Sequence, residues 1–515
     1  MSAIRLPSRL PATIAEALDH VVAVDPGRTA LRAPSGTLSY KQLDAAANAA
    51  AAQLAAIGVK RGDRVAATLP NDIDIVVAFH GAMRLGAIWL GINRPLAIPE
   101  KCAVLASARP AVLLADPASA AELGTAIGAA TVMTVDPSDP HDQWRAGLRA
   151  LAAAGRPDPP DAGAPAAIAY TSGTTGLPSG IVHSQRALLL PAASIVASRN
   201  YGVELHKGDC LPLTILNMMI LTTLLTAAAG GCCVVSDRRD ARGIAEWIGR
   251  ESITVWNGVP ALLHTMVTDD SIDPDWLSTL SEVWTGGADC PEELIAAFVA
   301  RFAVPIRSTY GLTEAPSVVA IDPIDAPHTA GASGVPLPHL DVVVRDEHGE
   351  PLPADRQGEI CVRATEDGEW KSTYEPMLGF WRDNRLEPFD RDELRTGDIG
   401  WLDGGGRIVV RDRKKLLIIR GGANVYPAEV ERVLCAVPGV RAAAVLGVPD
   451  ARLGQRVVAA VEADTAEGPV PEDLVAHCSA QLARYKVPER IVVVDELPRN
   501  SMGKLRRAVV SEMFL

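Results

Sequence analysis

The sequence predicts an α/β fold with more than one domain, and three observations lead to this prediction. The chain has 515 residues, more than one compact core usually holds. Apolar runs with strand character alternate with segments of helical spacing, which is typical of parallel sheets with helical crossovers. The final stretch of about 100 residues mixes amphipathic helices and strands, and its length suits a separate small domain.

The elements follow from local patterns. Residues 41–57 are Ala-rich and helical, and Gly58 ends that helix. Further strands are predicted at residues 64–69, 166–169 and 282–288, the last ending in its two glycines, and a further helix at 73–85. The longest apolar run, residues 211–235, is interrupted by Asn217 and a Gly-Gly pair, so we expect a buried helix followed by a strand rather than a membrane span.

Composition excludes several classes of protein. A hydrophobic content of 48% and a charged content of 22% are ordinary for a globular protein. The net charge of −13 argues against nucleic-acid binding. Eight scattered cysteines without C-x-x-C pairs, and an N-terminus without a signal-peptide run, predict a reduced, cytoplasmic protein without a zinc site. A homodimer is the default expectation for its assembly.

The most informative stretch is the segment 170–180, YTSGTTGLPSG, which follows the strand at 166–169. Its glycines let backbone N–H groups turn inward, and its hydroxyls add donors, so the loop is suited to phosphate oxygens. It is not a Walker loop, because the G-x-x-x-x-G-K-[ST] spacing is absent. The predicted nucleotide contacts in this loop are Thr171, Ser172, Gly173, Thr174, Thr175 and Gly176.

A second motif, STYGLTE, spans residues 308–314. Tyr310 offers a ring for stacking on adenine, Thr313 offers a hydroxyl for the α-phosphate, and Glu314 is an oxygen ligand suited to Mg²⁺. Upstream, EVWTGGA ends a strand in two glycines, which permit close approach to a flat ligand. For His183, which follows the phosphate loop, we expect a ring that satisfies a hydrogen bond near the loop rather than a catalytic role.

These motifs, together with RTGDIGWLD, RDRKKLLIIRGGANVYPAEVE and PRNSMGKLRR, occur in the order found in the adenylate-forming superfamily, which the chain resembles over nearly its whole length. That superfamily includes acyl-CoA synthetases, peptide-synthetase adenylation domains and beetle luciferases. The resemblance to a class I acyl-CoA ligase implies a large N-terminal domain of α/β sheets with a β-barrel lobe, residues 1–413. It also implies a small mobile α+β C-terminal domain, residues 414–515, with a hinge near Lys415.

The resemblance also assigns roles. Lys504, Thr174 and Glu314 would be catalytic, with Glu314 also the metal ligand, and ATP, Mg²⁺ and CoA would be bound. The glycines Gly421 and Gly422 would meet CoA. Besides the phosphate loop, the nucleotide contacts would be Gly286, Gly287, Ala288, Thr309, Tyr310, Gly311, Thr313, Asp398 and Arg413.

The acid substrate would meet residues of three segments: Ile215, Asn217, Trp256, Asn257 and Gly287. Ile215 stands where relatives often carry a bulky polar residue, which favours an apolar pocket wall. The segment has no carboxylate to pair with a substrate ammonium, so an uncharged acyl group is expected rather than an α-amino acid. Plain core packing is the alternative for this segment, and for Trp256.

Two departures from the family pattern leave alternatives open. Ser179 replaces a lysine of the phosphate loop, and Leu416 replaces an acidic residue after the hinge. The predicted function is formation of an acyl-adenylate with release of pyrophosphate, then transfer to CoA. The alternatives are transfer to an amine or a carrier protein, and a non-catalytic acyl-nucleotide-binding protein. The last is disfavoured by four retained residues, Lys504, Glu314, Asp398 and Arg413.

Overall fold

The computed structural model describes residues 10–123, 131–171, 179–286, 290–413, 416–420, 423–450, 453–464, 468–500 and 503–514. The chain divides into two compact units. The first contains residues 1–342 and 362–394, and the second contains residues 343–361 and 395–515. The predicted domain boundary after Arg413 remains a prediction.

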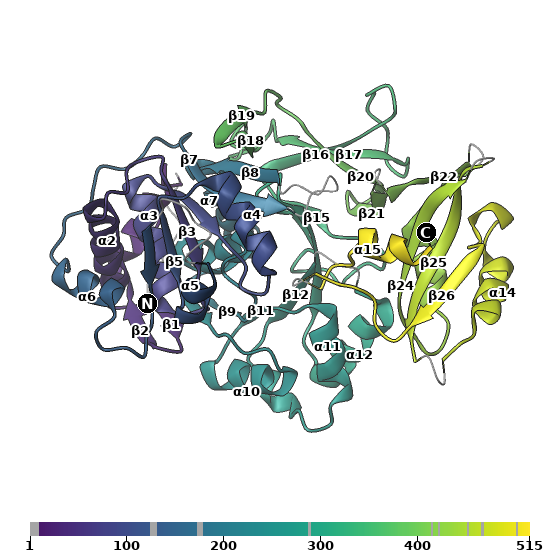
Figure 1. The fold of residues 1–515 in the computed structure, drawn as a ribbon, viewed down its shortest axis with the longest axis horizontal. Helices are drawn as coiled ribbons and strands as arrows, with labels where there is room; N and C mark the ends of the chain where they lie inside the picture. Colours follow the sequence, from purple (N-terminus) through teal and green to yellow (C-terminus); the bar gives the residue numbers. More distant parts are fainter. Residues whose placement is uncertain are drawn as a thin grey trace. The chain divides into compact units, whose positions relative to one another are not determined.

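Two large sheets form the first unit, as the alternation of strands and helices predicts (Figure 1). The nine-stranded sheet has the order β15-β14-β13-β12-β11-β9-β10-β1-β2. Its strands are β1 Thr29–Ala33, β2 Gly36–Ser39, β9 His206–Asp209, β10 Cys232–Val235, β11 Val255–Asn257, β12 Glu282–Gly286, β13 Ile306–Leu312, β14 Ser317–Ile321 and β15 Val335–Pro336.

The eight-stranded sheet has the order β19-β18-β8-β7-β4-β3-β5-β6. Its strands are β3 Arg64–Thr68, β4 Ile88–Gly91, β5 Val112–Ala115, β6 Thr131–Thr134, β7 Pro165–Thr171, β8 Ser179–Ser184, β18 Gly379–Arg382 and β19 Arg385–Pro388. The strands β3, β4, β5 and β6 pair in parallel, which requires the helical crossovers between them.

The α-helices of this unit are α1 Asp19–Val24, α2 Tyr40–Ala56, α3 Ile73–Leu85, α4 Ile98–Ala108, α5 Pro117–Leu123, α6 Gln143–Ala150, α7 Gln185–Arg199, α8 Leu216–Met218, α9 Leu225–Ala229, α10 Ala241–Glu251, α11 Pro260–Thr268 and α12 Glu292–Phe302. A π-helical stretch, Met219–Leu224, joins α8 to α9, so the predicted buried helix is present and β10 follows it. The helix α6 begins after Asp142, whose carboxylate caps it by accepting a hydrogen bond from the Arg145 N–H at 2.8 Å.

A four-stranded sheet has the order β16-β17-β20-β21 and occupies the segment in which a β-barrel lobe was expected. Its strands are β16 Leu340–Arg345, β17 Gly358–Ala364, β20 Leu394–Leu402 and β21 Ile408–Arg413. The rest of the second unit is α+β, with helices α13 Pro427–Cys435, α14 Pro471–Gln481 and α15 Arg507–Ser511 and strands β22 Ile418–Arg420, β23 Ala423–Val425, β24 Val440–Asp450, β25 Gly454–Ala463 and β26 Arg490–Val494. The predicted α/β fold with a large N-terminal part and a smaller C-terminal one is confirmed.

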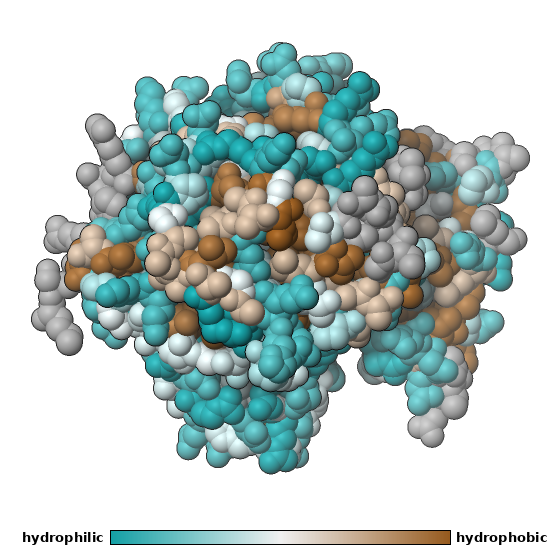
Figure 2. Space-filling model, turned by 60° about the vertical axis from the view of Figure 1, so that its left-hand side comes forward, coloured by the Kyte–Doolittle hydropathy of each residue, from teal (hydrophilic) through white to brown (hydrophobic). Residues whose placement is uncertain are grey.

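Hydrophilic residues cover much of the face seen in Figure 2, and hydrophobic residues form patches between them. Among the described residues, the exposed large hydrophobic side chains come from separate segments of the chain: Val24, Ile98, Val299, Ile324, Ile419, Val470 and Tyr485. Within the described part of the chain, no helix is long and apolar enough to cross a membrane.

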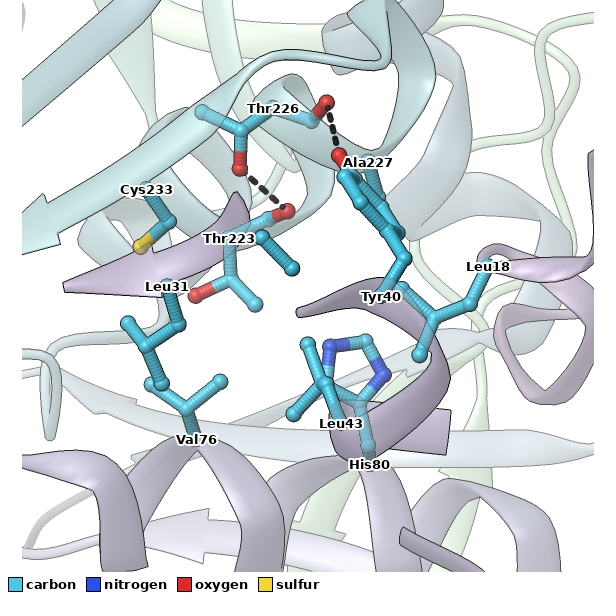
Figure 3. Close-up of a pocket in the computed structure, with 11 residues that line it drawn as sticks. Leu18, Leu31, Tyr40, Leu43, Val76, His80, Thr223, Thr226, Ala227 and Cys233 are labelled. Carbon is cyan, nitrogen blue, oxygen red and sulfur yellow. Dashed lines mark hydrogen bonds between the residues drawn. The ribbon is translucent and has the colours of Figure 1, made fainter. Parts of the chain in front are cut away.

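A small cavity of about 10 Å³ lies among α2, α3, β1 and the helix that precedes β10 (Figure 3). Tyr40, the first residue of α2, reaches across it and donates from its hydroxyl to the carbonyl oxygens of Thr226, at 3.0 Å, and Gly231, at 2.8 Å. Burial lowers the pKa of His80, which also lines the cavity, to about 3. The cavity has room for about one water molecule, so it is a packing defect rather than a substrate pocket.

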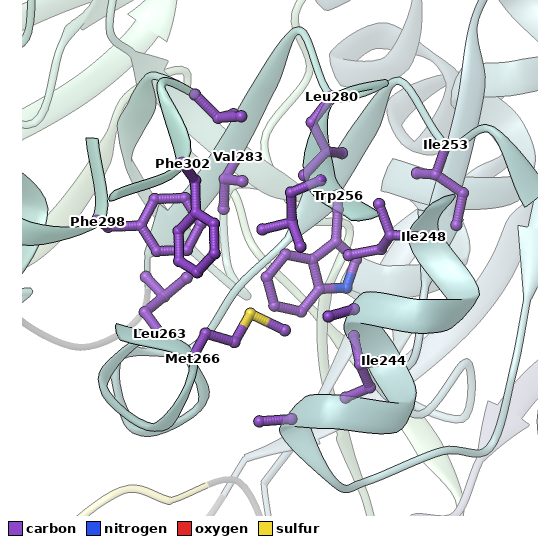
Figure 4. Packing of buried hydrophobic residues seen from close by; sticks show 14 of the residues in the cluster. Ile244, Ile248, Ile253, Trp256, Leu263, Met266, Leu280, Val283, Phe298 and Phe302 are labelled. Atoms are coloured by element: carbon purple, nitrogen blue, oxygen red, sulfur yellow. The ribbon is translucent and has the colours of Figure 1, made fainter. Parts of the chain in front are cut away.

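The core that packs against β11 and β12 of the nine-stranded sheet is made of large apolar side chains. Helices α10, α11 and α12 pack on one face of β11 and β12, and Figure 4 shows Trp256 enclosed by Ile244, Ile248 and Met266. Phe298 and Phe302 of α12 lie with their ring centroids 4.8 Å apart in the same cluster. Burial of this many large apolar side chains holds the ends of β11 and β12 in fixed positions.

Candidate active site

The phosphate loop joins two paired strands. β7 ends at Thr171 and β8 begins at Ser179, and the two strands are antiparallel with Thr171 opposite Ser179. The Tyr170 hydroxyl donates to Ser107 Oγ at 3.0 Å, which anchors the end of β7 to α4. The loop residues predicted to hold phosphate lie outside the described residues: Ser172, Gly173, Thr174, Thr175 and Gly176.

His183 ties the strand after the loop to the second motif. Its Nε2 lies 2.7 Å from the carbonyl oxygen of Thr313, and its side chain is fully buried. Burial lowers the pKa of His183 to about 4, although the bond to Thr313 opposes that shift. The ring is therefore neutral at pH 7, and because a carbonyl can only accept, Nε2 carries the proton. The expected hydrogen bond of the His183 ring is present, and its lack of a catalytic role stays a prediction.

The predicted adenine edge is formed by the ends of two parallel strands, β12 and β13. Gly286 pairs with Thr309, and the Thr309 hydroxyl donates to the Thr285 carbonyl at 3.0 Å. A methyl group on Gly286 would lie far inside 3.0 Å of Thr309 Oγ1, so only glycine allows the strands to approach this closely. Gly287 and Ala288 lie outside the described residues.

The Y-G-L-T-E motif spans the end of β13 and the turn into β14. Tyr310 is buried, at 8% exposure, and the strands shift register between Tyr310 and Gly311. Such a bulge redirects the side chains that follow it. Thr313 and Glu314, in the turn, are both half-buried.

Glu314 could bind a magnesium ion only together with ligands that the protein does not supply, such as substrate phosphate and water. In the described segments there is no group of three or more His, Cys, Asp or Glu side chains that could hold a metal ion. Mg²⁺ commonly takes one or two carboxylates and fills its remaining positions with substrate phosphate and water. A single half-buried carboxylate is compatible with that arrangement.

Two predicted acid contacts, Trp256 and Asn257, are neighbours on β11 and therefore point to opposite faces of the sheet. Trp256 is 1% exposed and belongs to the core in Figure 4, so its contact with the acid stays a prediction. Asn257 is the last residue of β11 and is also buried, and its amide donates to Asp209 Oδ2. With its nitrogen committed to Asp209, the amide of Asn257 presents its oxygen to other partners.

Asp209 was missed by the sequence reasoning, although it ends β9 next to β11. Its carboxylate accepts from the Leu211 N–H at 2.9 Å and from the Thr222 hydroxyl at 3.1 Å, and it lies 3.3 Å from Lys207 Nζ. Both members of this ion pair are fully buried. The signal that could have revealed it is a lysine and an aspartate two residues apart just before the long apolar run, because buried charges must be paired.

The Asn71 side chain holds the backbone just before Ile215 and Asn217 by two hydrogen bonds. The Asn71 side chain donates to the Leu211 carbonyl at 2.9 Å and accepts from the Leu213 N–H at 2.8 Å. Ile215 precedes α8 and is half-buried, and Asn217 Oδ1 accepts a short hydrogen bond from the Ser317 hydroxyl. The sulfur of Met218, the residue after Asn217, is 3.8 Å from the Asn257 amide nitrogen.

The remaining predicted residues belong to the second unit. Asp398 lies within β20, opposite Arg413 of β21, rather than at a strand end, and it is only 2% exposed. Its N–H donates to Thr396 Oγ1 at 3.0 Å. For Arg413 only the backbone is described, and Lys415, Gly421 and Gly422 lie outside the described residues.

Lys504 is exposed and sits at the end of a tight turn. Its N–H donates to Asn500 Oδ1 at 2.9 Å, and its carbonyl accepts from the Asn500 N–H at 2.8 Å. Gly503, with φ of +75°, supplies the left-handed conformation that closes the turn. The backbone at Lys504 is therefore fixed on both sides.

Comparisons with known proteins identify the family of this chain. Residues 18–366 match the model of the AMP-binding enzyme family, and residues 429–504 match that of the AMP-binding enzyme C-terminal domain. The long-chain-fatty-acid–CoA ligase FadD13 of Mycobacterium tuberculosis is 32% identical over 490 residues, which cover 93% of each chain.

Solved structures of the same architecture are also similar. The ATP-bound MatB of Rhodopseudomonas palustris superposes with a TM-score of 0.88 at 28% identity, covering 98% of this chain and 99% of MatB. The amide bond synthetase McbA of Marinactinospora thermotolerans superposes with a TM-score of 0.84 at 28% identity, covering 98% of this chain and all of McbA. The chain therefore belongs to the AMP-binding enzyme family, the adenylate-forming superfamily that includes the acyl-CoA ligases, and it is a ligase that activates a carboxylic acid with ATP.

Proposed function

We propose that this ligase transfers its activated acyl group to CoA and is a carboxylate–CoA ligase that forms AMP. In the first step a carboxylate oxygen attacks the α-phosphorus of ATP, the bond to pyrophosphate breaks, and an acyl-adenylate forms. In the second step the CoA sulfur, having lost its proton, attacks the acyl carbon, and AMP leaves with the electron pair of the broken C–O bond. The products are the thioester, AMP and pyrophosphate.

One observation carries the proposal: neighbouring parallel strands end in the residue types that the chemistry needs. Asn257, Gly286 and Thr309 lie at or near the carboxyl ends of β11, β12 and β13, and the turn after β13 carries Thr313 and Glu314. Ligands of α/β sheets bind outside the carboxyl ends of the strands. The similarity to FadD13 over nearly the whole chain supports CoA as the acceptor.

The first step brings two anions together, so the enzyme must neutralise charge. We assign this role to the backbone N–H groups of Gly173 to Gly176, the hydroxyls of Thr174 and Thr313, and the ammonium of Lys504. Glu314 would hold Mg²⁺, which supplies further charge neutralisation when bound. No protein nucleophile is required, because positioning and electrostatics carry the displacement.

The remaining contacts follow the same logic. Asp398 would accept hydrogen bonds from the ribose hydroxyls, with Arg413 beside it in the ladder. Gly421 and Gly422 would let the backbone approach the pantetheine arm of CoA. The acid would contact Ile215, Asn217 and Asn257. None of these side chains is charged, so they suit an uncharged acyl group.

The second candidate is transfer of the acyl group to an amine, which the similarity to the amide bond synthetase McbA favours. It shares the adenylation step and differs only in the nucleophile. Transfer to a carrier protein is a variant of the same kind. Product analysis separates all three acceptors.

The test is ATP-dependent release of pyrophosphate over a panel of alkyl, aryl and amino acids, each with and without CoA. We expect release with some of the acids and a CoA thioester when CoA is present. Lys504→Ala should reduce release at least 100-fold if this cation stabilises the transition state, as loss of one such donor costs about 10²–10³ in rate. Lys60→Ala, which also removes an exposed lysine, is the matched control and should behave like the unaltered enzyme.

Amide formation without a thioester would overturn the CoA proposal while leaving adenylation intact. A Lys504→Ala variant that keeps full activity would refute the assignment of the catalytic lysine. Bound ATP without pyrophosphate release for any acid would favour a binding protein and contradict the proposal.

A further inference from the structure

Ser317 has an unusual backbone conformation for its surroundings. In the described part of the chain, nine residues other than glycine have a positive φ, and Ser317, at +86°, is the only one of them that is buried. Four of the others end helices: Arg109, Asn200, Ser252 and Ala303. A left-handed conformation is unfavourable for a residue with a Cβ atom, and such outliers cluster at functional sites.

The conformation of Ser317 serves two contacts. Its hydroxyl donates a short hydrogen bond to Asn217 Oδ1, a hundred residues earlier in the chain. Its carbonyl oxygen lies against Gly311 so closely that a methyl group there would fall well inside 3.0 Å. Ser317 therefore connects the acid-binding segment to the Y-G-L-T-E motif directly.

The turn between β13 and β14 is consequently held at both ends. At one end His183, which follows the phosphate loop, contacts the Thr313 carbonyl at 2.7 Å. At the other end Ser317 holds the side chain of Asn217. Because the serine hydroxyl occupies Oδ1, the amide of Asn217 has its NH₂ group left for another partner.

We propose that Ser317 is a positioning residue for the reaction: it fixes the Asn217 amide so that its NH₂ group donates to the bound acid. The inference rests on the proposed function and deepens it. Ser317 itself does not touch the acid. It sets the distance between the acid and the nucleotide segments, which a reaction between a carboxylate and an α-phosphorus requires.

The test compares Ser317→Ala with Ser317→Gly. Both variants lack the hydroxyl, but only glycine relieves the positive φ. We expect both to raise the KM for the acid by about three- to tenfold, the effect of losing one hydrogen bond, with little change in the KM for ATP. Ser372→Ala and Ser372→Gly are matched controls, because Ser372 also has a positive φ, +55°, but is exposed, and they should leave both constants unchanged.

A double-mutant cycle distinguishes positioning from a purely structural role. If Ser317 acts through Asn217, Asn217→Ala combined with Ser317→Ala should raise the KM for the acid no further than Asn217→Ala alone. Multiplicative effects, an unchanged KM in Ser317→Ala, or opposite effects of alanine and glycine would each overturn the inference. The unaltered enzyme must first release pyrophosphate with an acid, so failure of the proposed function shows in that enzyme and failure of this inference shows only in the variants.

Discussion

The buried, neutral His183 makes the first unit sensitive to acid, and His183→Gln tests this. Burial lowers the pKa of His183 from 6.5 to about 4 in the folded protein. Below pH 6.5 the unfolded chain therefore binds a proton that the folded chain excludes, and stability falls as the pH falls from 6.5 towards 4. Between pH 7 and pH 5 this difference amounts to about 2 kcal/mol of unfolding free energy.

Glutamine is the appropriate replacement, because its amide N–H can still donate to the Thr313 carbonyl but does not titrate in this range. Between pH 7 and pH 5 the variant should lose about 2 kcal/mol less stability than the unaltered protein, whatever its stability at pH 7. The buried histidines His80 and His339, whose pKa values burial lowers to about 3, are common to both proteins and cancel in the comparison.

The assay is urea denaturation at pH 7 and pH 5, followed by tryptophan fluorescence. All tryptophans except Trp401 belong to the first unit, so the signal reports the unit that contains His183. The exposed His264→Gln is the control and should keep the pH dependence of the unaltered protein. If His183→Gln loses as much stability between the two pH values as the unaltered protein does, the histidine is not neutral in the folded state and the reasoning fails.

Two further substitutions test the packing that supports the site. Gly286→Ala forces β12 away from Thr309, so it should lower the unfolding free energy by about 1–3 kcal/mol and raise the KM for ATP. Gly155→Ala is the control and should change neither quantity, because no atom lies within 4 Å of the added methyl group. Normal stability and ATP binding in Gly286→Ala would contradict the close approach of the strands. Tyr40→Phe removes the hydroxyl that donates to the buried carbonyls of Thr226 and Gly231, and should lower the unfolding free energy by about 1 kcal/mol in urea denaturation, because the Thr226 carbonyl keeps its bond from the Gly231 N–H. The half-exposed Tyr485→Phe should have little effect, and equal losses in the two variants would show that the Tyr40 hydroxyl contributes nothing specific.

Much of the secondary structure was predictable because it depends on neighbours in the chain. The helix predicted at residues 73–85 is α3, Ile73–Leu85, whose apolar spacing and following Gly86 mark it locally. The strand predicted at residues 282–288 is β12, described as Glu282–Gly286. The strand predicted at residues 64–69 is β3, Arg64–Thr68, which ends one residue earlier, since the ends of such elements are the least sharply marked by local sequence.

The sequence by itself determined the order of the motifs, and with it the family and the adenylation chemistry, because short glycine- and hydroxyl-rich loops retain their chemistry wherever they are placed. Only the tertiary structure decided which residues support them. Asp209 holds Asn257 across 48 positions, His183 holds Thr313 across 130, and Ser317 holds Asn217 across 100. Such contacts depend on how strands are ordered in a sheet and which helix covers its face, and a periodic pattern read along the chain carries no information about either.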